Sequence, residues 1–168
     1  MKKTLPTEAR LKEVLKYSAE TGLFTWVRPT SFRVIKGATA GTIAAIGYRY
    51  IGVDGVICLA HRMAFVFMTG EWPVNYVDHI NGDRLDNRWA NLRDVSQAVN
   101  CQNRRNPTKS SLTKIIGVHG KSVNSTKPFT SAIHINRKKI HLGCFDTQQE
   151  ASAAYVAAKR QLHPGGML

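Results

Sequence analysis

The distribution of charge along the chain divides it into two parts. Residues 95–145 contain no aspartate or glutamate, although they hold nine lysine and arginine residues. The segment at 106–111 is polar, contains a proline and has no apolar periodicity, as is typical of a linker. A chain of 168 residues can form one large domain or two small ones. We therefore predict two units with different tasks, at 1–105 and 114–164, joined by a linker at 106–113.

The overall composition restricts the partners and the compartment. The chain has 24 basic against 11 acidic residues and a net charge of +13, which indicates a polyanionic partner, nucleic acid before an acidic membrane surface. Its three cysteines, Cys58, Cys101 and Cys144, are odd in number, which excludes a complete set of internal disulfides. No Cys-x-x-Cys pair is present, so a cysteine-based zinc site has no support. No apolar run suits a signal peptide or approaches the ~18 residues of a membrane span. We expect a soluble intracellular protein with no membrane partner.

Local patterns predict the elements of the first unit. A helix is expected around Leu11 to Leu15, with Thr7 as its N-cap and Gly22 ending the segment. Asp54-Gly55 predicts a tight hairpin, because both central positions of such a turn need a positive φ. An apolar helix is expected from about Leu59 to Thr69, ended by the glycine that follows. Four strands are also predicted, at 24–27, 42–46, 48–53 and 56–59.

The second unit is predicted to be a three-stranded sheet with one helix. Extended runs at 129–135 and 139–145 are expected to form a hairpin, and an earlier strand is expected at 115–119. Thr147 to Glu150 form a capping box that starts a helix, and alanines at helical spacing let that helix pack closely on a sheet. The fold class expected for the whole chain is α+β.

Residues 76–93 concentrate polar groups in a turn-rich segment. Asp78 and His79 are adjacent in a predicted strand, so their side chains point in different directions, and one can hold a metal ion while the other reaches a water molecule. Ser96 can cap a following helix whose first turns contain Asn100. Hydrolysis of a phosphodiester needs a hard cation on oxygen ligands and a base for the attacking water. Asp-His pairs and Asn-Gly turns are ordinary alone; their spacing here favours a catalytic site.

Basic side chains near this segment and in the second unit are candidates for DNA contact. Arginines of the first unit lie close enough in sequence to hold a phosphate. In the second unit the candidates follow from charge and strand position, and a solvated surface charge stays the alternative for each. The complete set is Arg84, Arg88, Arg93, Arg104, Arg105, Lys121, His134, Arg137, Lys138, Lys139 and His141.

The polar segment and its neighbours resemble a known family. The matching residues are His61-Arg62, Asp78 to Asp83, Asn87-Arg88, Asn91 to Arg93 and Asn100. This string is similar to the HNH homing endonucleases of phages and mobile introns. The resemblance covers residues 11–105, with its core motif at 59–105, and implies a ββα-metal fold in which two strands and a helix hold one divalent cation.

The resemblance also implies roles for individual residues. His79 corresponds to the general base, Asp78 and Asn100 to the metal ligands, and Asn91 to the residue that braces the loop or orients the histidine. Asn100 stands where many members have a final histidine, which favours Mg²⁺ or Mn²⁺ over Zn²⁺. No small-molecule cofactor is expected. His61 is expected to be a structural residue of its helix.

Residues 115–163 resemble a second family. The matching residues include Gly117-Val118, Ala132-Ile133, Leu142-Gly143, Phe145 to Thr147 and Ala154-Tyr155. They are similar to the DNA-binding domain of plant ethylene-response factors (the AP-two type), in which a three-stranded sheet lies in the major groove. Phe129 replaces the usual tryptophan, and His119 with Lys121 stands near the family's base-reading arginines.

Together these features predict a metal-dependent DNA endonuclease of the homing type. It would hydrolyse double-stranded DNA to 5′-phosphate and 3′-hydroxyl ends, in the cytoplasm of a bacterial host if phage-encoded. Whether it nicks or cuts both strands, and whether it dimerises, stays open. One alternative is a non-catalytic DNA-binding regulator with a relic HNH unit. Another is an RNA-binding protein, which would expose stacking aromatics on its sheet, whereas Phe129 is expected in the core.

Overall fold

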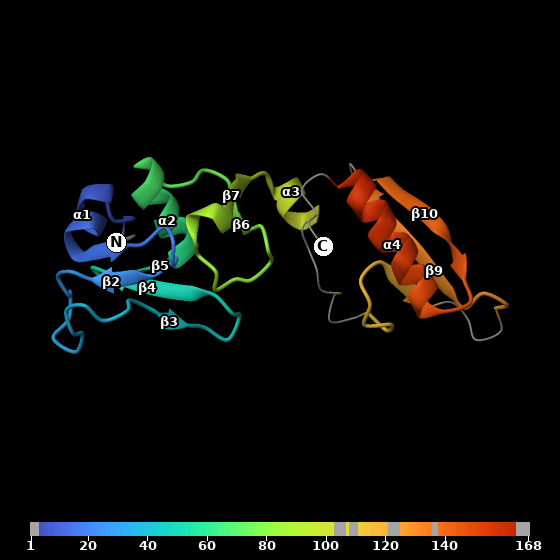
Figure 1. The fold of residues 1–168 in the computed structure, drawn as a ribbon, viewed down its shortest axis with the longest axis horizontal. Helices are drawn as coiled ribbons and strands as arrows, with labels where there is room; N and C mark the ends of the chain where they lie inside the picture. Colours follow the sequence, from blue (N-terminus) through green and yellow to red (C-terminus); the bar gives the residue numbers. More distant parts are fainter. Residues whose placement is uncertain (1–3, 103–106, 108–110, 121–124, 136–137, 164–168) are drawn as a thin grey trace. The chain divides into compact units, whose positions relative to one another are not determined.

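The chain forms two units, residues 1–96 and residues 97–168 (Figure 1). The computed structural model describes residues 4–102, 107, 111–120, 125–135 and 138–163. The predicted linker at 106–113 falls within the second unit and lies partly outside the described residues. The described part contains four α-helices and several small sheets, so the predicted α+β class is confirmed.

The first unit opens with a short helix and a hairpin. Helix α1 (Glu8–Val14) begins at Thr7, whose side chain accepts a hydrogen bond from Arg10 N, as the sequence predicts. The helix ends earlier than predicted, because Leu15–Tyr17 forms strand β1 and pairs antiparallel with β2 (Phe24–Trp26). Gly22, at φ 71°, lies in the turn between these strands instead of ending a helix.

A second small sheet follows in the order β3-β4-β5. Strand β3 is only Thr42–Ile43, shorter than the predicted 42–46, because the chain turns back by hydrogen bonds between Ala44 and Tyr48 and between Gly47 and Ala44. Asp54 and Gly55 take φ 52° and 74°, so the predicted tight turn joins β4 to β5. The other two strands are β4 (Arg49–Val53) and β5 (Val56–Leu59). Helix α2 (Ala60–Thr69) follows directly and ends at Gly70, which is in the left-handed conformation.

Buried apolar side chains join these elements into one core. They come from α1, the two hairpins and α2, and include Leu11, Phe24, Ile51, Met63 and Val66, each with no exposed surface. Removing this apolar surface from water is the main stabilising contribution to a unit of this size. The core holds α2 against the strand that follows it, because Val77 and Leu92 belong to the same cluster.

The last elements of the first unit form a hairpin with a long connection. Strand β6 (Tyr76–His79) pairs antiparallel with β7 (Leu92–Val95), and the 3₁₀ turn η1 (Trp89–Asn91) precedes β7. Helix α3 (Gln97–Gln102) comes next in sequence and groups with the second unit.

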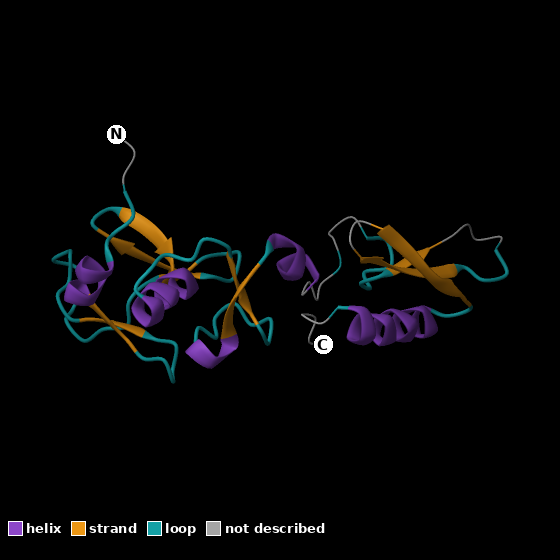
Figure 2. Ribbon diagram, turned by 90° about the horizontal axis from the view of Figure 1, so that it is seen from above, coloured by secondary structure: helices purple, strands orange, loops and turns teal. Residues whose placement is uncertain are grey.

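The second unit is a sheet with a helix on one face (Figure 2). The sheet order is β10-β9-β8, from β8 (Val118–Gly120), β9 (Phe129–Ile135) and β10 (Lys138–Phe145). Strand β8 starts later than the predicted 115–119, because Val118 N bonds Ile115 O in a turn. Helix α4 (Gln148–Leu162) starts with the predicted capping box at Thr147 and Glu150.

The core of the second unit is small. Ile133 of β9 packs with Tyr155 and Ala158 of α4, and Ile135 and Leu142 lie against them. No helix among the described residues is long and apolar enough to cross a membrane. All three cysteines are free thiols, and Cys58 is buried.

Candidate functional site

The β6–β7 hairpin places Asp78 and His79 at the C-terminal end of β6. Asp78 faces Arg93 across the ladder and His79 faces Leu92. Both residues are buried in the first unit: Asp78 is 8 % exposed and His79 only 3 %. A carboxylate and an imidazole so deeply buried need specific partners to offset their desolvation.

Asp78 is held by its cross-strand neighbour. Arg93 Nε and Nη2 both donate to Asp78 Oδ2, at 3.1 and 2.8 Å. The Asp78 side chain is 10 % exposed and that of Arg93 24 %, so the ion pair is largely shielded from water. The structure thus brings a predicted metal ligand and a predicted phosphate-binding arginine into direct contact.

The ring of His79 is oriented by Asn87. His79 Nε2 lies 3.0 Å from Asn87 Oδ1, and Asn87 Nδ2 donates to Leu85 O at 3.3 Å, which fixes the amide with its oxygen toward the imidazole. An amide oxygen only accepts, so Nε2 carries the hydrogen and Nδ1 keeps the basic lone pair. Burial lowers the pKa of His79, partly offset by this hydrogen bond and by Asp78, so that the neutral ring predominates at pH 7.

The N-terminal hairpin holds Asn87 in place. Tyr17 Oη donates to Asn87 O at 2.7 Å, and Trp89 N donates to Ala19 O at 3.0 Å. Gly22 touches the same backbone, because a Cβ added there would lie 2.5 Å from Arg88 N. Asn87 is only 1 % exposed. The residue that orients His79 therefore depends on contacts with a segment about 70 residues earlier in the chain.

Asn91 braces the loop instead of the imidazole. Its Oδ1 accepts from Asn81 N at 2.9 Å, and its Nδ2 donates to Asn81 Oδ1 and to Asp86 O at 3.0 and 2.8 Å. Of the two roles that the family resemblance implies for Asn91, the contacts match the loop brace. The ring-orienting contact comes from Asn87, which belongs to the residues that carry the family resemblance but to which the sequence assigned no role, because asparagine is an ordinary turn residue.

A second imidazole lies beside the first. The ring of His61, on α2, is 5.0 Å from that of His79 in an edge-to-face arrangement, and Tyr48 lies 5.2 Å from His61. Burial, followed by the effects of His79 and Arg62, lowers the pKa of His61 to about 3. His61 is therefore a neutral ring that packs against the site, in accord with the structural role expected for it but closer to His79 than the sequence indicates.

The remaining arginines of the segment are engaged within the unit. Arg84 Nη1 donates to Ile46 O at 2.7 Å, and its guanidinium lies 4.8 Å from the Tyr48 ring centre. Arg88 makes a two-point ion pair with Asp86 at 2.7 and 2.6 Å, and this guanidinium lowers the pKa of Asp86 to about 2. Both arginine side chains are exposed at the surface of the loop.

The fit of a metal ion depends on the oxygen donors near Asp78. Among the described residues, no three His, Cys, Asp or Glu side chains lie together as a ready metal site. The donors that the family resemblance implies are the carboxylate of Asp78 and the amide of Asn100. Mg²⁺ typically keeps several waters and binds one or two carboxylates plus phosphate oxygens, so this donor set suits it and does not suit Zn²⁺. Asn100 lies on α3, in the second unit, and its position relative to Asp78 stays a prediction.

The open face of the second unit's sheet carries some of the predicted contacts. Pairing across the ladder puts Lys139 opposite His134 and His141 opposite Ala132, so these side chains share one face. Ile133 and Ile135 point to the other face, where α4 packs, and Lys138 pairs with Ile135 on that face. Arg104, Arg105, Lys121 and Arg137 lie outside the described residues.

The open face also contains groups that were not predicted as contacts. His119 pairs with Thr130, whose Oγ1 lies 3.3 Å from His141 Nδ1, and Cys144 Sγ lies 3.7 Å from His141 Nε2. Among the residues that the structure describes, this face is therefore polar and rich in imidazole, and Lys139 is its lysine.

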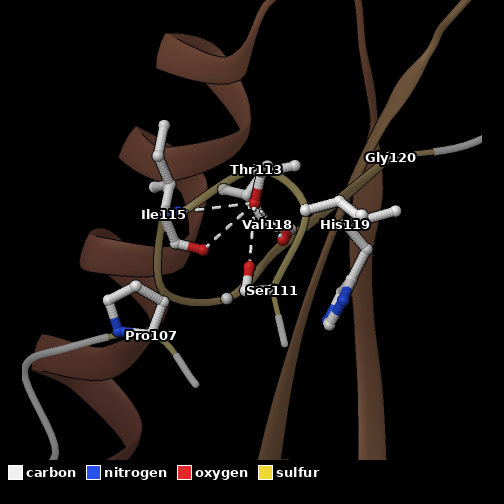
Figure 3. A pocket seen from close by; sticks show the side chains of 9 residues that line it. Pro107, Ser111, Thr113, Ile115, Val118, His119 and Gly120 are labelled. Carbon is white, nitrogen blue, oxygen red and sulfur yellow. Dashed lines mark hydrogen bonds between the residues drawn. The ribbon is translucent and has the colours of Figure 1, made fainter. Parts of the chain in front are cut away.

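A hollow of about 370 Å³ lies beside β8 in the second unit (Figure 3). Thr113 Oγ1 organises its wall by donating to Val118 O at 2.8 Å, with Ser111 Oγ 3.3 Å away. Its lining is apolar or short and polar apart from His119. None of the predicted site residues lines it.

Comparison with known proteins gives one match. Residues 58–102 match the HNH endonuclease family model. This segment runs from the end of β5 to the end of α3 and contains Asp78, His79, Asn91 and Asn100. No curated protein and no solved structure matches the chain. The match supports a nuclease hydrolase at the level of the family, and it implies DNA as the substrate.

Proposed function

We infer that this protein is a metal-dependent DNA endonuclease whose reaction takes place at His79. The observation that carries the inference is the buried His79 ring, whose Nε2 bonds Asn87 Oδ1 within the HNH-like segment. This contact leaves Nδ1 as the basic nitrogen of a neutral imidazole, as a general base at neutral pH requires.

In the proposed reaction, His79 Nδ1 takes a proton from a water molecule whose oxygen forms the new bond to phosphorus. The bond from phosphorus to the 3′ oxygen breaks, and that oxygen takes up a proton, giving 5′-phosphate and 3′-hydroxyl ends. Asp78 and Asn100 would hold one Mg²⁺ or Mn²⁺, which when bound supplies positive charge to the leaving oxygen and the phosphoryl group.

For the cation and DNA to bind as proposed, Arg93 has to move away from Asp78. Its guanidinium occupies Asp78 Oδ2, and the same guanidinium is suited to a phosphate oxygen. Entry of DNA would transfer Arg93 from the carboxylate to the phosphate and release Asp78 for the cation. Arg84 and Arg88, at the surface of the loop, are the further phosphate contacts of this unit.

The second unit is proposed to supply most of the DNA affinity, through an ethylene-response-factor-like sheet. Its open face carries His134, Lys139 and His141, whereas Lys138 lies on the helix-covered face. Lys121 and Arg137 add positive charge, and Arg104 and Arg105 add more between the HNH-like segment and the sheet in the sequence. The unit limits of 1–105 and 114–164, the homing role and the phage origin belong to the same proposal. The oligomeric state decides whether it nicks or cuts both strands.

Purified protein incubated with supercoiled plasmid and Mg²⁺ tests the proposal. We expect nicked or linear DNA that EDTA abolishes and added Mg²⁺ or Mn²⁺ restores. Intact plasmid under all these conditions, with binding retained in a gel-shift assay, would instead favour the non-catalytic DNA-binding regulator.

A further inference from the structure

A loop of the first unit presents apolar side chains that the fold does not use. The chain leaves β2 after Trp26 and returns at Gly37, where Gly37 N donates to Trp26 O at 2.7 Å and Trp26 N to Ala38 O at 3.0 Å. Within the loop, Val34 packs on the core, and Val34 N donates to Ser31 O at 3.1 Å. The loop is thus closed at its base and anchored in its middle.

The side chains on either side of that anchor point into solvent. Phe32 is 93 % exposed and Ile35 is 76 % exposed. Single exposed apolar residues are common on protein surfaces. Two of them within four positions, on a loop whose core contact comes from the residue between them, need a further explanation.

The surroundings of Phe32 are positively charged. Residues 21–53 contain no aspartate or glutamate, whereas the loop carries Arg28, Arg33 and Lys36, all exposed. Arg33 lies over the Phe32 ring with its guanidinium carbon 5.3 Å from the ring centre. Arg28 is paired with Glu13 at 2.5 Å, which leaves Arg33 and Lys36 as the cations at the tip.

An exposed aromatic ring between cations fits the chemistry of duplex DNA. Lysine and arginine contact phosphates, and apolar side chains of DNA-bending proteins enter base steps and unstack them. We propose that the loop at residues 28–36 is a DNA-contacting element in which Phe32 stacks on or between bases. The proposal rests on DNA being the substrate, and it assigns to the first unit a DNA contact outside the HNH-like segment.

The full-length protein with a fluorescein-labelled 40-bp duplex of mixed sequence, in EDTA so that no cutting occurs, tests this contact. Phe32→Ala should weaken binding about 5- to 100-fold, the value of a lost base–aromatic contact. Phe32→Trp should keep the affinity, and its additional indole emission should be quenched by the duplex. Arg33→Gln and Lys36→Gln should each reduce the slope of log K against log[salt] by about 0.9 if each contacts one phosphate.

Val74→Ala is the matched control, because Val74 is 94 % exposed on the same unit and lies outside the loop. Equal affinity of Phe32→Ala and wild type, or an unquenched indole in Phe32→Trp, overturns the proposal. So does binding to vesicles with 30 % phosphatidylserine that Phe32→Ala loses while its duplex affinity is unchanged, since the loop would then contact a membrane. Cleavage of plasmid by the wild type is scored separately. If cleavage is absent but Phe32→Ala weakens duplex binding, the loop contact stands and the endonuclease proposal fails.

Discussion

The two units differ most in how their charges are balanced. The first has 13 basic and 9 acidic residues, and the second has 11 basic and only 2 acidic residues. In the first unit, acids hold Arg10, Arg28, Arg88 and Arg93 in defined positions. Two acids cannot neutralise eleven cations, so most of the second unit's positive charge is available to a polyanion. This difference in charge balance favours precise placement of groups as the task of the first unit and electrostatic attraction of DNA as the task proposed for the second.

The largest effect should come from the imidazole of the first unit. His79→Ala should lower plasmid cleavage at saturating enzyme by roughly 10²- to 10⁴-fold, since a positioned base contributes about that much. DNA affinity should stay nearly unchanged, because it is assigned to the second unit and to the loop at 28–36, not to His79. Val74→Ala is the control, because Val74 is 94 % exposed and lies outside the proposed contacts. A folded His79→Ala protein that cleaves at the wild-type rate would refute the separation of tasks.

The next largest effect should come from the residue that orients the His79 ring. Asn87→Ala removes the oxygen that orients His79, and we expect cleavage to fall roughly 10-fold, as is common when a supporting contact is lost. Asn75→Ala, at an exposed asparagine of the same unit, should have no effect. Single-turnover rates at saturating duplex make the measurement. Equal rates for Asn87→Ala and wild type would show that the ring needs no such support.

A smaller effect is expected in the second unit. Lys139→Gln should weaken duplex binding by about 8-fold at 0.1 M salt and flatten the salt slope by about 0.9, the value of one phosphate contact. Lys138→Gln is the matched control, because the adjacent lysine pairs on the helix-covered face. Duplex affinity measured for both variants over a range of salt concentrations gives the two slopes. If Lys138→Gln has the larger effect, the helix-covered face contacts DNA, and if neither changes the slope, the sheet does not.

The smallest effect concerns the stability of the first unit. In the folded protein the pKa of His61 is about 3, against its ordinary 6.5, so between these values only the unfolded chain takes up the proton. Stability from this group is fully present above pH 6.5 and is lost as pH falls toward 3, by at most about 1.4 kcal/mol per pH unit.

Between pH 6.5 and 5.5 the wild type should therefore lose about 1 kcal/mol of unfolding free energy that the His61→Phe variant does not lose. Urea unfolding followed by tryptophan fluorescence measures it, since Trp26, Trp72 and Trp89 all belong to the first unit. Ile57→Phe, at a 73 % exposed residue of the same unit, is the control. A difference from wild type that does not change with pH would mean that His61 is protonated alike in both states.

The sequence predicted features that are set by neighbouring residues. The Asp54-Gly55 turn and the Thr147–Glu150 capping box depend on one or two backbone angles and a local hydrogen bond, so the residues themselves determine them. Strand β1 was missed because Leu15–Tyr17 has no strand pattern of its own and forms by pairing with β2.

In the candidate site, too, the sequence predicted the local features and missed the contacts between distant residues. Adjacent Asp78 and His79 on a strand follow from the motif, and the structure places them there. The Asp78–Arg93 ion pair depends on the register of β6 against β7, and the orientation of His79 by Asn87 depends on Tyr17. Such contacts between distant positions cannot be deduced from spacing in a single sequence.

The hydrogen bond from Tyr17 to Asn87 also sets a minimum length for any segment that could carry the proposed site into another protein. The segment at 58–102 that matches the family model contains His79 and Asn87 but lacks Tyr17, the turn at Gly22 and the core residues Leu11 and Phe24. Cut out alone, it would expose the apolar side of α2 and leave the Asn87 backbone unsupported. A portable cassette would need to start no later than Thr7, about fifty residues before the motif begins.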